Sequence, residues 1–165
     1  MSRLLTFLCV AFAMVFHGGG LLAPSVAQAK EEWSVQCSRQ QCQMYAEIRL
    51  QNGTLFNNIA FRKLNATTYA GIVKLPLGIH IPSGINIGID QAAIIQAKLI
   101  TCNPDGCEAA FTANQTVVDF LKRGEKMSIL VRKAGDRKQL ALNYSLMGFT
   151  RNWNEFHKRM EILMP

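Results

Sequence analysis

Histidine and the common catalytic motifs are scarce in this chain. It has only three histidines, and it contains no G-x-S-x-G, H-E-x-x-H or phosphate-binding P-loop motif. His80 lies in a short alternating apolar run and is expected to face solvent, while His157 is expected to be a surface residue of a basic tail. Acidic residues are scattered, although a pair such as Asp90 and Asp105 could meet in space. The sequence predicts no catalytic residues, no bound metal and no cofactor.

The chain also lacks a second long apolar run after its N-terminus. Arg3 precedes an apolar stretch over residues 4–16, which is too short to anchor the chain across a bilayer. Small residues at Ala27 and Ala29 fit an A-x-A cleavage site. This pattern predicts a cleaved signal peptide over residues 1–29, and an uncleaved N-terminal membrane anchor is the alternative.

A single domain is predicted for the rest of the chain. Residues 30–165 contain no internal repeat or linker, and their length allows about two-thirds of the unfolded surface to be buried. The last part, residues 150–165, is a basic aromatic tail. Export would place this domain in the periplasm, in the medium or on the outer surface.

Cysteine usage agrees with export to an oxidising compartment. Cys9 is lost with the signal peptide, and the other four cysteines form two C-x4-C pairs, Cys37 with Cys42 and Cys102 with Cys107. The second pair encloses Asn-Pro-Asp-Gly, which is strong turn chemistry, and the first encloses four polar residues. We therefore predict two disulfides that each close a hairpin. A four-thiolate zinc site and a redox pair are the alternatives, but both normally use shorter spacings.

The dominant local pattern is alternation of apolar and polar residues, which indicates strands with one buried face. Short strands separated by turn residues predict an all-β sandwich or barrel. The predicted strands cover residues 33–37, 42–50, 58–64, 69–75, 79–81, 85–89, 95–102, 107–112, 127–132 and 138–146.

One internal helix and a C-terminal helix interrupt this pattern. Thr116 is the predicted N-cap of the internal helix, Asp119 follows in a capping-box relation, and Gly124 ends the helix. The tail has apolar residues at helical spacing, which predicts a docked amphipathic helix. These residues are Trp153, Phe156, Met160, Leu163 and Met164.

Basic residues exceed acidic ones, and the formal net charge of +7 becomes +6 once Arg3 is removed. Seven basic residues fall within 17 positions, and they form one cationic patch if the helix end and the following hairpin lie on the same side. Such a patch would bind an anionic envelope or host surface, with peripheral membrane contact and without nucleic acid. A solvated charged rim is the alternative. The seven residues are Lys122, Arg123, Lys126, Arg132, Lys133, Arg137 and Lys138.

Several ordered landmarks resemble the invasion-associated locus B family of bacterial exported proteins. They are the signal peptide, Trp33-Ser34-Val35-Gln36-Cys37 with Cys42, Leu75-Pro76-Leu77-Gly78, Gly84, Ile89-Asp90, Cys102 with Gly106-Cys107, Leu121-Lys122-Arg123-Gly124 and Ser145-Leu146-Met147-Gly148-Phe149.

The resemblance implies a periplasmic or surface-associated β-sandwich with immunoglobulin-like architecture and without established catalytic residues. It also implies that the family pattern stops soon after Phe149, so that the tail is particular to this chain. Two functions follow as expectations. One is a non-enzymatic envelope protein that binds a protein or an anionic glycan or lipid, with a contribution to host-cell interaction. The other is a periplasmic inhibitor or accessory factor that presents residues 75–84 to an enzyme.

Overall fold

The computed structural model describes residues 33–39, 41–91 and 93–163, so the predicted signal peptide lies outside the described residues. The strands are β1 (Trp33–Ser38), β2 (Gln41–Arg49), β3 (Leu55–Lys63), β4 (Tyr69–Leu75), β5 (Ile85–Ile89), β6 (Ala93–Asn103), β7 (Gly106–Ala113), β8 (Lys126–Arg132) and β9 (Gln139–Ser145). The helices are η1 (Ile81–Ser83), α1 (Gln115–Arg123) and α2 (Phe149–Leu163). The all-β class with an internal and a C-terminal helix is confirmed.

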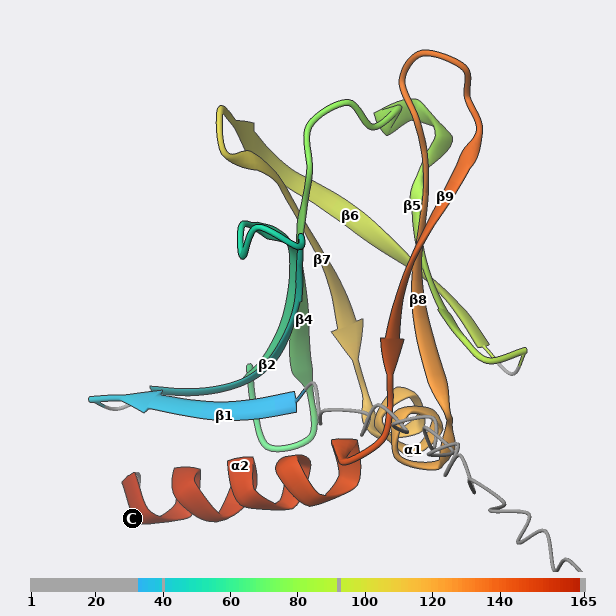
Figure 1. Ribbon diagram of the computed structural model, residues 1–165. Coiled ribbons are helices and arrows are strands. Elements are labelled where there is room, and N and C mark those ends of the chain that lie inside the picture. The colour runs from blue at the N-terminus through green and yellow to red at the C-terminus, as the bar shows by residue number, and fades with distance from the viewer. Residues whose placement is uncertain (1–32, 40, 92, 164–165) are drawn as a thin grey trace, which may run out of the picture.

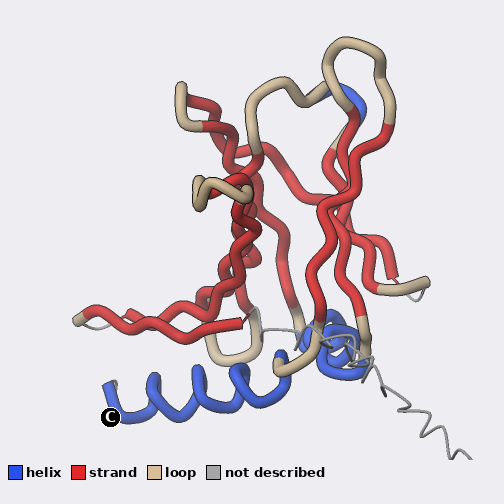
Figure 2. The backbone as a smooth tube through the Cα atoms, viewed as in Figure 1, coloured by secondary structure: helices blue, strands red, loops and turns tan. Residues whose placement is uncertain are grey.

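One antiparallel sheet curls to form both layers of the sandwich. Its strand order is β1-β2-β3-β4-β7-β6-β5-β8-β9. β6 belongs to both layers, because its first half pairs with β5 and its second half pairs with β7. Figure 1 shows β6 crossing between the layers, and Figure 2 shows both helices at one end of the sheet. The sandwich is thus a single sheet that folds back on itself at a long corner strand.

The two predicted disulfides, Cys37–Cys42 and Cys102–Cys107, are both present. Each joins residues that lie directly opposite each other in a hairpin, β1–β2 in one case and β6–β7 in the other. Because each bridge closes only a short loop, it limits the unfolded chain little and mainly fixes the local hairpin.

Aromatic side chains fill the core between the layers and α2. Trp33 packs on Phe61, Tyr144 and Phe149, and its indole nitrogen donates to the Ser145 carbonyl at 2.8 Å. This contact joins the two edge strands β1 and β9. The edges of the curled sheet are thereby closed together on the side next to α2.

The internal helix ends where the sequence predicts, but its start was predicted wrongly. Asn114, not Thr116, is the N-cap, and its side-chain oxygen accepts the Val117 N–H at 3.0 Å. The helix therefore starts directly after β7. Gly124 has a negative φ of −75°, so left-handed backbone does not explain this glycine. A Cβ there would lie 2.9 Å from a carboxylate oxygen of Asp90 and 3.0 Å from the Phe120 carbonyl oxygen, so a larger residue would force these groups to move.

The predicted strand at residues 79–81 is reduced to one isolated bridge. Ile79 pairs with Lys133, and the chain then turns through the 3-10 helix η1. Pro82 sits in the first turn of η1, where its missing N–H costs nothing. The segment is a loop at the end of the sheet opposite the helices (Figure 1).

Candidate binding surface

The seven predicted patch residues do not form one surface. Lys122, Arg123 and Lys126 lie at the end of α1 and the start of β8, whereas the other four begin at the opposite end of β8. A seven-residue strand separates these two groups by roughly 20 Å. Figure 1 shows α1 at one end of β8 and the β8–β9 loop at the other. The expectation of a single patch is therefore wrong.

The four residues at the far end belong to a compact feature that we call the tip, defined as residues 76–84 and 132–138. Its two segments are joined through their backbones, because Ala134 N donates to Gly78 O at 2.7 Å and His80 N donates to Arg132 O at 2.7 Å. The Arg132 guanidinium also donates to the Arg137 carbonyl at 2.9 Å. The tip is thus one preorganised unit.

His80 fastens the tip internally and is half-buried, which corrects its predicted solvent-facing position. Its Nδ1 lies 2.7 Å from the Ser83 hydroxyl and 3.5 Å from an Arg137 guanidinium nitrogen. The imidazole therefore links η1 to the β8–β9 hairpin. Its partners are structural, and no carboxylate holds it as a triad would require.

The tip combines exposed apolar side chains with excess positive charge. Leu77 is 57% exposed and Ile81 is 41% exposed. Arg132, Lys133, Arg137 and Lys138 are all exposed, and Asp136 is the only acidic residue of the tip. Asp136 forms an ion pair with Lys138, and the four basic residues and Asp136 together give the tip a net charge of +3.

The residues at the α1 end carry no comparable excess. Asp90 accepts the backbone N–H groups of Glu125 and Lys126 at 3.1 and 2.9 Å, so its carboxylate lies beside this group. Together with Asp119 and Glu125, it balances the three predicted basic residues there. The charges of these six residues sum to zero, whereas those of the tip sum to +3.

The position of His157 also differs from the sequence prediction, which expected a surface residue. His157 lies on the sheet-facing side of α2, half-buried, with Nε2 2.9 Å from the Tyr69 hydroxyl. Burial lowers the pKa of His157. The positive charges of Lys63 and Lys122 lower this pKa further, and the negative charge of Glu161 partly opposes the shift. The signal was present in the sequence, because His157 follows Trp153 by four residues and so shares its helical face.

The lowered pKa of His157 leads to a pH-dependent stability. In the unfolded chain His157 has a pKa near 6.5, so the unfolded chain binds a proton there more readily than the folded chain does. The contribution of neutral His157 to the free energy of unfolding is therefore complete above pH 6.5 and is lost as the pH falls. We expect His157→Gln, which keeps a hydrogen-bonding group near Tyr69, to lose less stability between neutral and mildly acidic pH. Urea unfolding across that range measures the difference. Parallel pH profiles for the two proteins would contradict it.

Metal and membrane-spanning features are not found in the part of the chain that the structure describes. Within residues 33–39, 41–91 and 93–163, no three His, Cys, Asp or Glu side chains gather closely enough to hold a metal ion. No helix in the same ranges is long and apolar enough to cross a membrane.

These features define a class: a small, disulfide-bonded β protein with a preorganised cationic and apolar tip. The family model described as "Invasion associated locus B (IalB) protein" matches residues 33–156, and the chain belongs to this family. The match ends at residue 156, so it includes the first half of α2 but not the last residues of the tail.

Individual relatives agree with this assignment. The chain is 26% identical over 144 residues to an Invasion protein B homolog of Brucella abortus, covering 84% of this chain and 82% of the relative. It is 24% identical over 135 residues to Invasion protein B of Bartonella bacilliformis, covering 78% and 73%. The crystal structure of invasion associated protein B from Bartonella henselae has a TM-score of 0.71 at 23% identity, covering 79% of this chain and 95% of that one. This last likeness concerns the fold.

Proposed function

We propose that the protein is an exported, non-enzymatic envelope protein that docks reversibly to anionic lipid headgroups through the tip. The proposal rests on one observation: the tip is a rigid unit that presents the exposed side chains of Leu77 and Ile81 together with a net charge of +3. The signal-like N-terminus and the two disulfides support export. The names of the relatives associate them with invasion, and contact with a host membrane is one setting in which this docking would act.

The expected affinity is modest. Each Lys or Arg near an anionic leaflet contributes about 1 kcal/mol, so the net charge of the tip provides roughly 3 kcal/mol. Partial burial of Leu77 and Ile81 among lipid chains adds a second, apolar contribution. Attraction to anionic lipids and buried apolar area together determine the strength of such peripheral binding.

A tip substitution therefore weakens vesicle binding. We expect Leu77→Ser and Arg137→Gly each to reduce binding to phosphatidylglycerol-containing vesicles by about fivefold, which corresponds to roughly 1 kcal/mol. Arg137 has a left-handed φ of 57°, so glycine removes the charge without straining the hairpin. Co-sedimentation with vesicles at low and high salt measures the change.

Ile94 provides the matched control for the apolar substitution. It is 77% exposed, and it lies opposite Gly88, near the end of β5 that is remote from the tip. Ile94→Ser is expected to bind vesicles like the unchanged protein. Equal binding to neutral phosphatidylcholine vesicles, or equal losses in the Ile94 and Leu77 variants, would reject docking through the tip.

The second candidate function is inhibition of an envelope enzyme by the same loop. The rigid presentation of Leu77 favours it, because a preorganised loop loses little entropy on binding. An inhibition assay against a lysozyme-type hydrolase separates the two functions. Inhibition that Leu77→Ser abolishes, in a protein that does not bind vesicles, would favour the inhibitor.

A further inference from the structure

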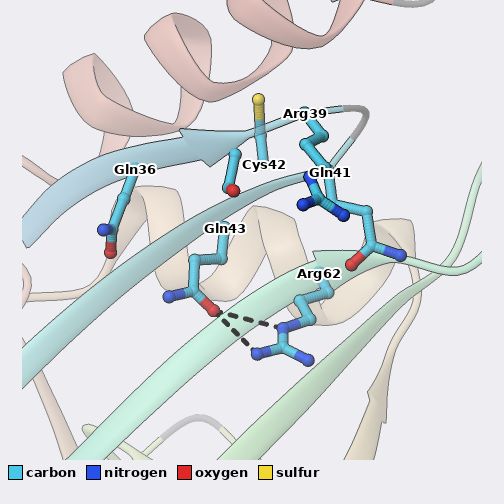
Figure 3. A pocket seen from close by; sticks show the side chains of 7 residues that line it. Gln36, Arg39, Gln41, Cys42, Gln43 and Arg62 are labelled. Carbon is cyan, nitrogen blue, oxygen red and sulfur yellow. Dashed lines mark hydrogen bonds between the residues drawn. The ribbon is translucent and has the colours of Figure 1, made fainter.

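An open pocket of about 630 Å³ lies beside the first disulfide hairpin, remote from the tip. Figure 3 shows its side chains projecting from the face of β1–β3 that points away from α2, whereas the Cys42 sulfur points to the other side. Apart from Cys42, its lining is wholly polar: Gln36, Ser38, Arg39, Gln41, Gln43 and Arg62. The register explains the grouping, because Gln36 lies opposite Gln43 and Ser38 lies opposite Gln41.

The pocket presents hydrogen-bond donors and positive charge. Arg62 donates from Nε and Nη2 to the Gln43 side-chain oxygen at 3.2 and 2.9 Å (Figure 3). A guanidinium has five N–H groups, so three remain for a ligand, and the Gln43 amide nitrogen adds more. Arg39 supplies a second guanidinium, and none of the described residues that line the pocket is acidic.

Arg39 occupies a position that usually favours glycine or asparagine. Its φ is 54°, in the left-handed region, where a residue with a Cβ is uncommon. The hairpin therefore keeps a long cationic side chain at the rim of the pocket at some conformational cost. Such an arrangement is common where a side chain serves binding.

We propose that this pocket binds an acidic saccharide of about two sugar units. Guanidinium groups match carboxylate and sulfate oxygens in paired hydrogen bonds, and amide and hydroxyl side chains both donate to and accept from sugar hydroxyls. The row from Gln36 through Gln43 to Arg62 crosses three strands, about 10 Å, which suits a disaccharide.

Calorimetric titration with three disaccharides tests the proposal. The probes are a sulfated heparin disaccharide, a hyaluronan disaccharide that carries only a carboxylate, and neutral maltose. We expect both acidic probes to bind and maltose not to bind. A preference for the heparin disaccharide would identify sulfate as the recognised group, and equal binding would identify the carboxylate as sufficient.

Two variants locate the binding to the pocket. Arg39→Gly removes one guanidinium and suits the left-handed backbone, so thermal stability is expected to be kept while affinity for the acidic probes falls at least fivefold. Arg62→Gln should produce a similar loss. Arg49→Gln is the matched control, because Arg49 lies at the far end of β2 and pairs with Glu47 outside the pocket, so its loss should leave affinity unchanged.

The proposal is overturned if the unchanged protein binds no acidic probe at millimolar concentration or binds maltose equally well. Wild-type affinity in both Arg39→Gly and Arg62→Gln would also overturn it. Failure here is separable from failure of vesicle docking, since the pocket variants leave the tip intact. Arg137→Gly should conversely leave disaccharide binding unchanged.

Discussion

Replacing Trp153 with alanine is expected to destabilise the whole domain by about 3–5 kcal/mol, the usual cost of removing a large buried aromatic side chain. Trp153 is only 3% exposed, and its ring contacts Phe61, Tyr69 and Phe149 at centroid distances of 5.7, 4.6 and 5.5 Å. These partners come from β3, β4 and the start of α2, so the substitution opens a cavity where the helix meets the sheet.

Chemical denaturation measures the change, and differential scanning calorimetry should show a fall in Tm of roughly 10 °C or more. Ile162→Ala on the same helix is the matched control, because Ile162 is 70% exposed and should change stability by no more than about 0.5 kcal/mol. A Trp153→Ala protein of nearly normal stability would mean that α2 is an appendage to a domain that folds without it.

The fold was largely accessible from the sequence, because alternation in strands and helical spacing are local signals. The spacing of Trp153, Phe156 and Met160 predicted α2, and all three are buried against the sheet. Leu163 is 36% exposed, and Met164 lies outside the described residues. Alternation likewise predicted β4 over residues 69–75, with the bounds that it has in the structure.

Local signals failed where a neighbouring element determines the outcome. The N-cap moved to Asn114 because β7 continues to Ala113, which leaves Asn114 extended and able to cap. The sheet-like run near His80 became a loop because its pairing with the β8–β9 hairpin is limited to the single bridge at Ile79. In both cases the deciding contact lies outside the short window in which the pattern was read.

The candidate surfaces were harder to predict than the fold. Basic residues close in sequence were assigned to one patch, but β8 carries Lys126 and Arg132 to opposite ends of the sheet. The pocket could not be assembled from the sequence, because bringing Arg62 beside Gln43 depends on the β2–β3 register. The pairing of β2 with β3 shifts register between Ile48 and Arg49, and no local sequence motif predicts this shift.

Replacing Asn57, a buried polar residue that joins the two layers of the sandwich, is expected to cause the second large loss of stability. Asn57 on β3 is fully buried, donates to the Lys74 carbonyl on β4 and accepts from the Tyr144 hydroxyl on β9. Asn57→Leu keeps the branched shape of the side chain but removes both hydrogen bonds. We expect a loss of about 3 kcal/mol, because two buried polar atoms each lose a partner.

Asn58→Leu is the matched control, since the next residue of a strand points to the opposite face and Asn58 is only half-buried. Urea denaturation of both proteins measures the difference, and equal effects would mean that the Asn57 bonds contribute nothing specific.

A double-mutant cycle with Tyr144→Phe then isolates the bond across the sandwich. Each single substitution leaves a polar partner behind, whereas the double substitution removes both groups of this bond. The double variant should therefore be more stable than the sum of the single effects implies, by at least 0.5 kcal/mol for residues in one hydrogen-bonded network. Strict additivity would show that β3 and β9 are held together by aromatic packing alone, with Trp33 between them as the main link.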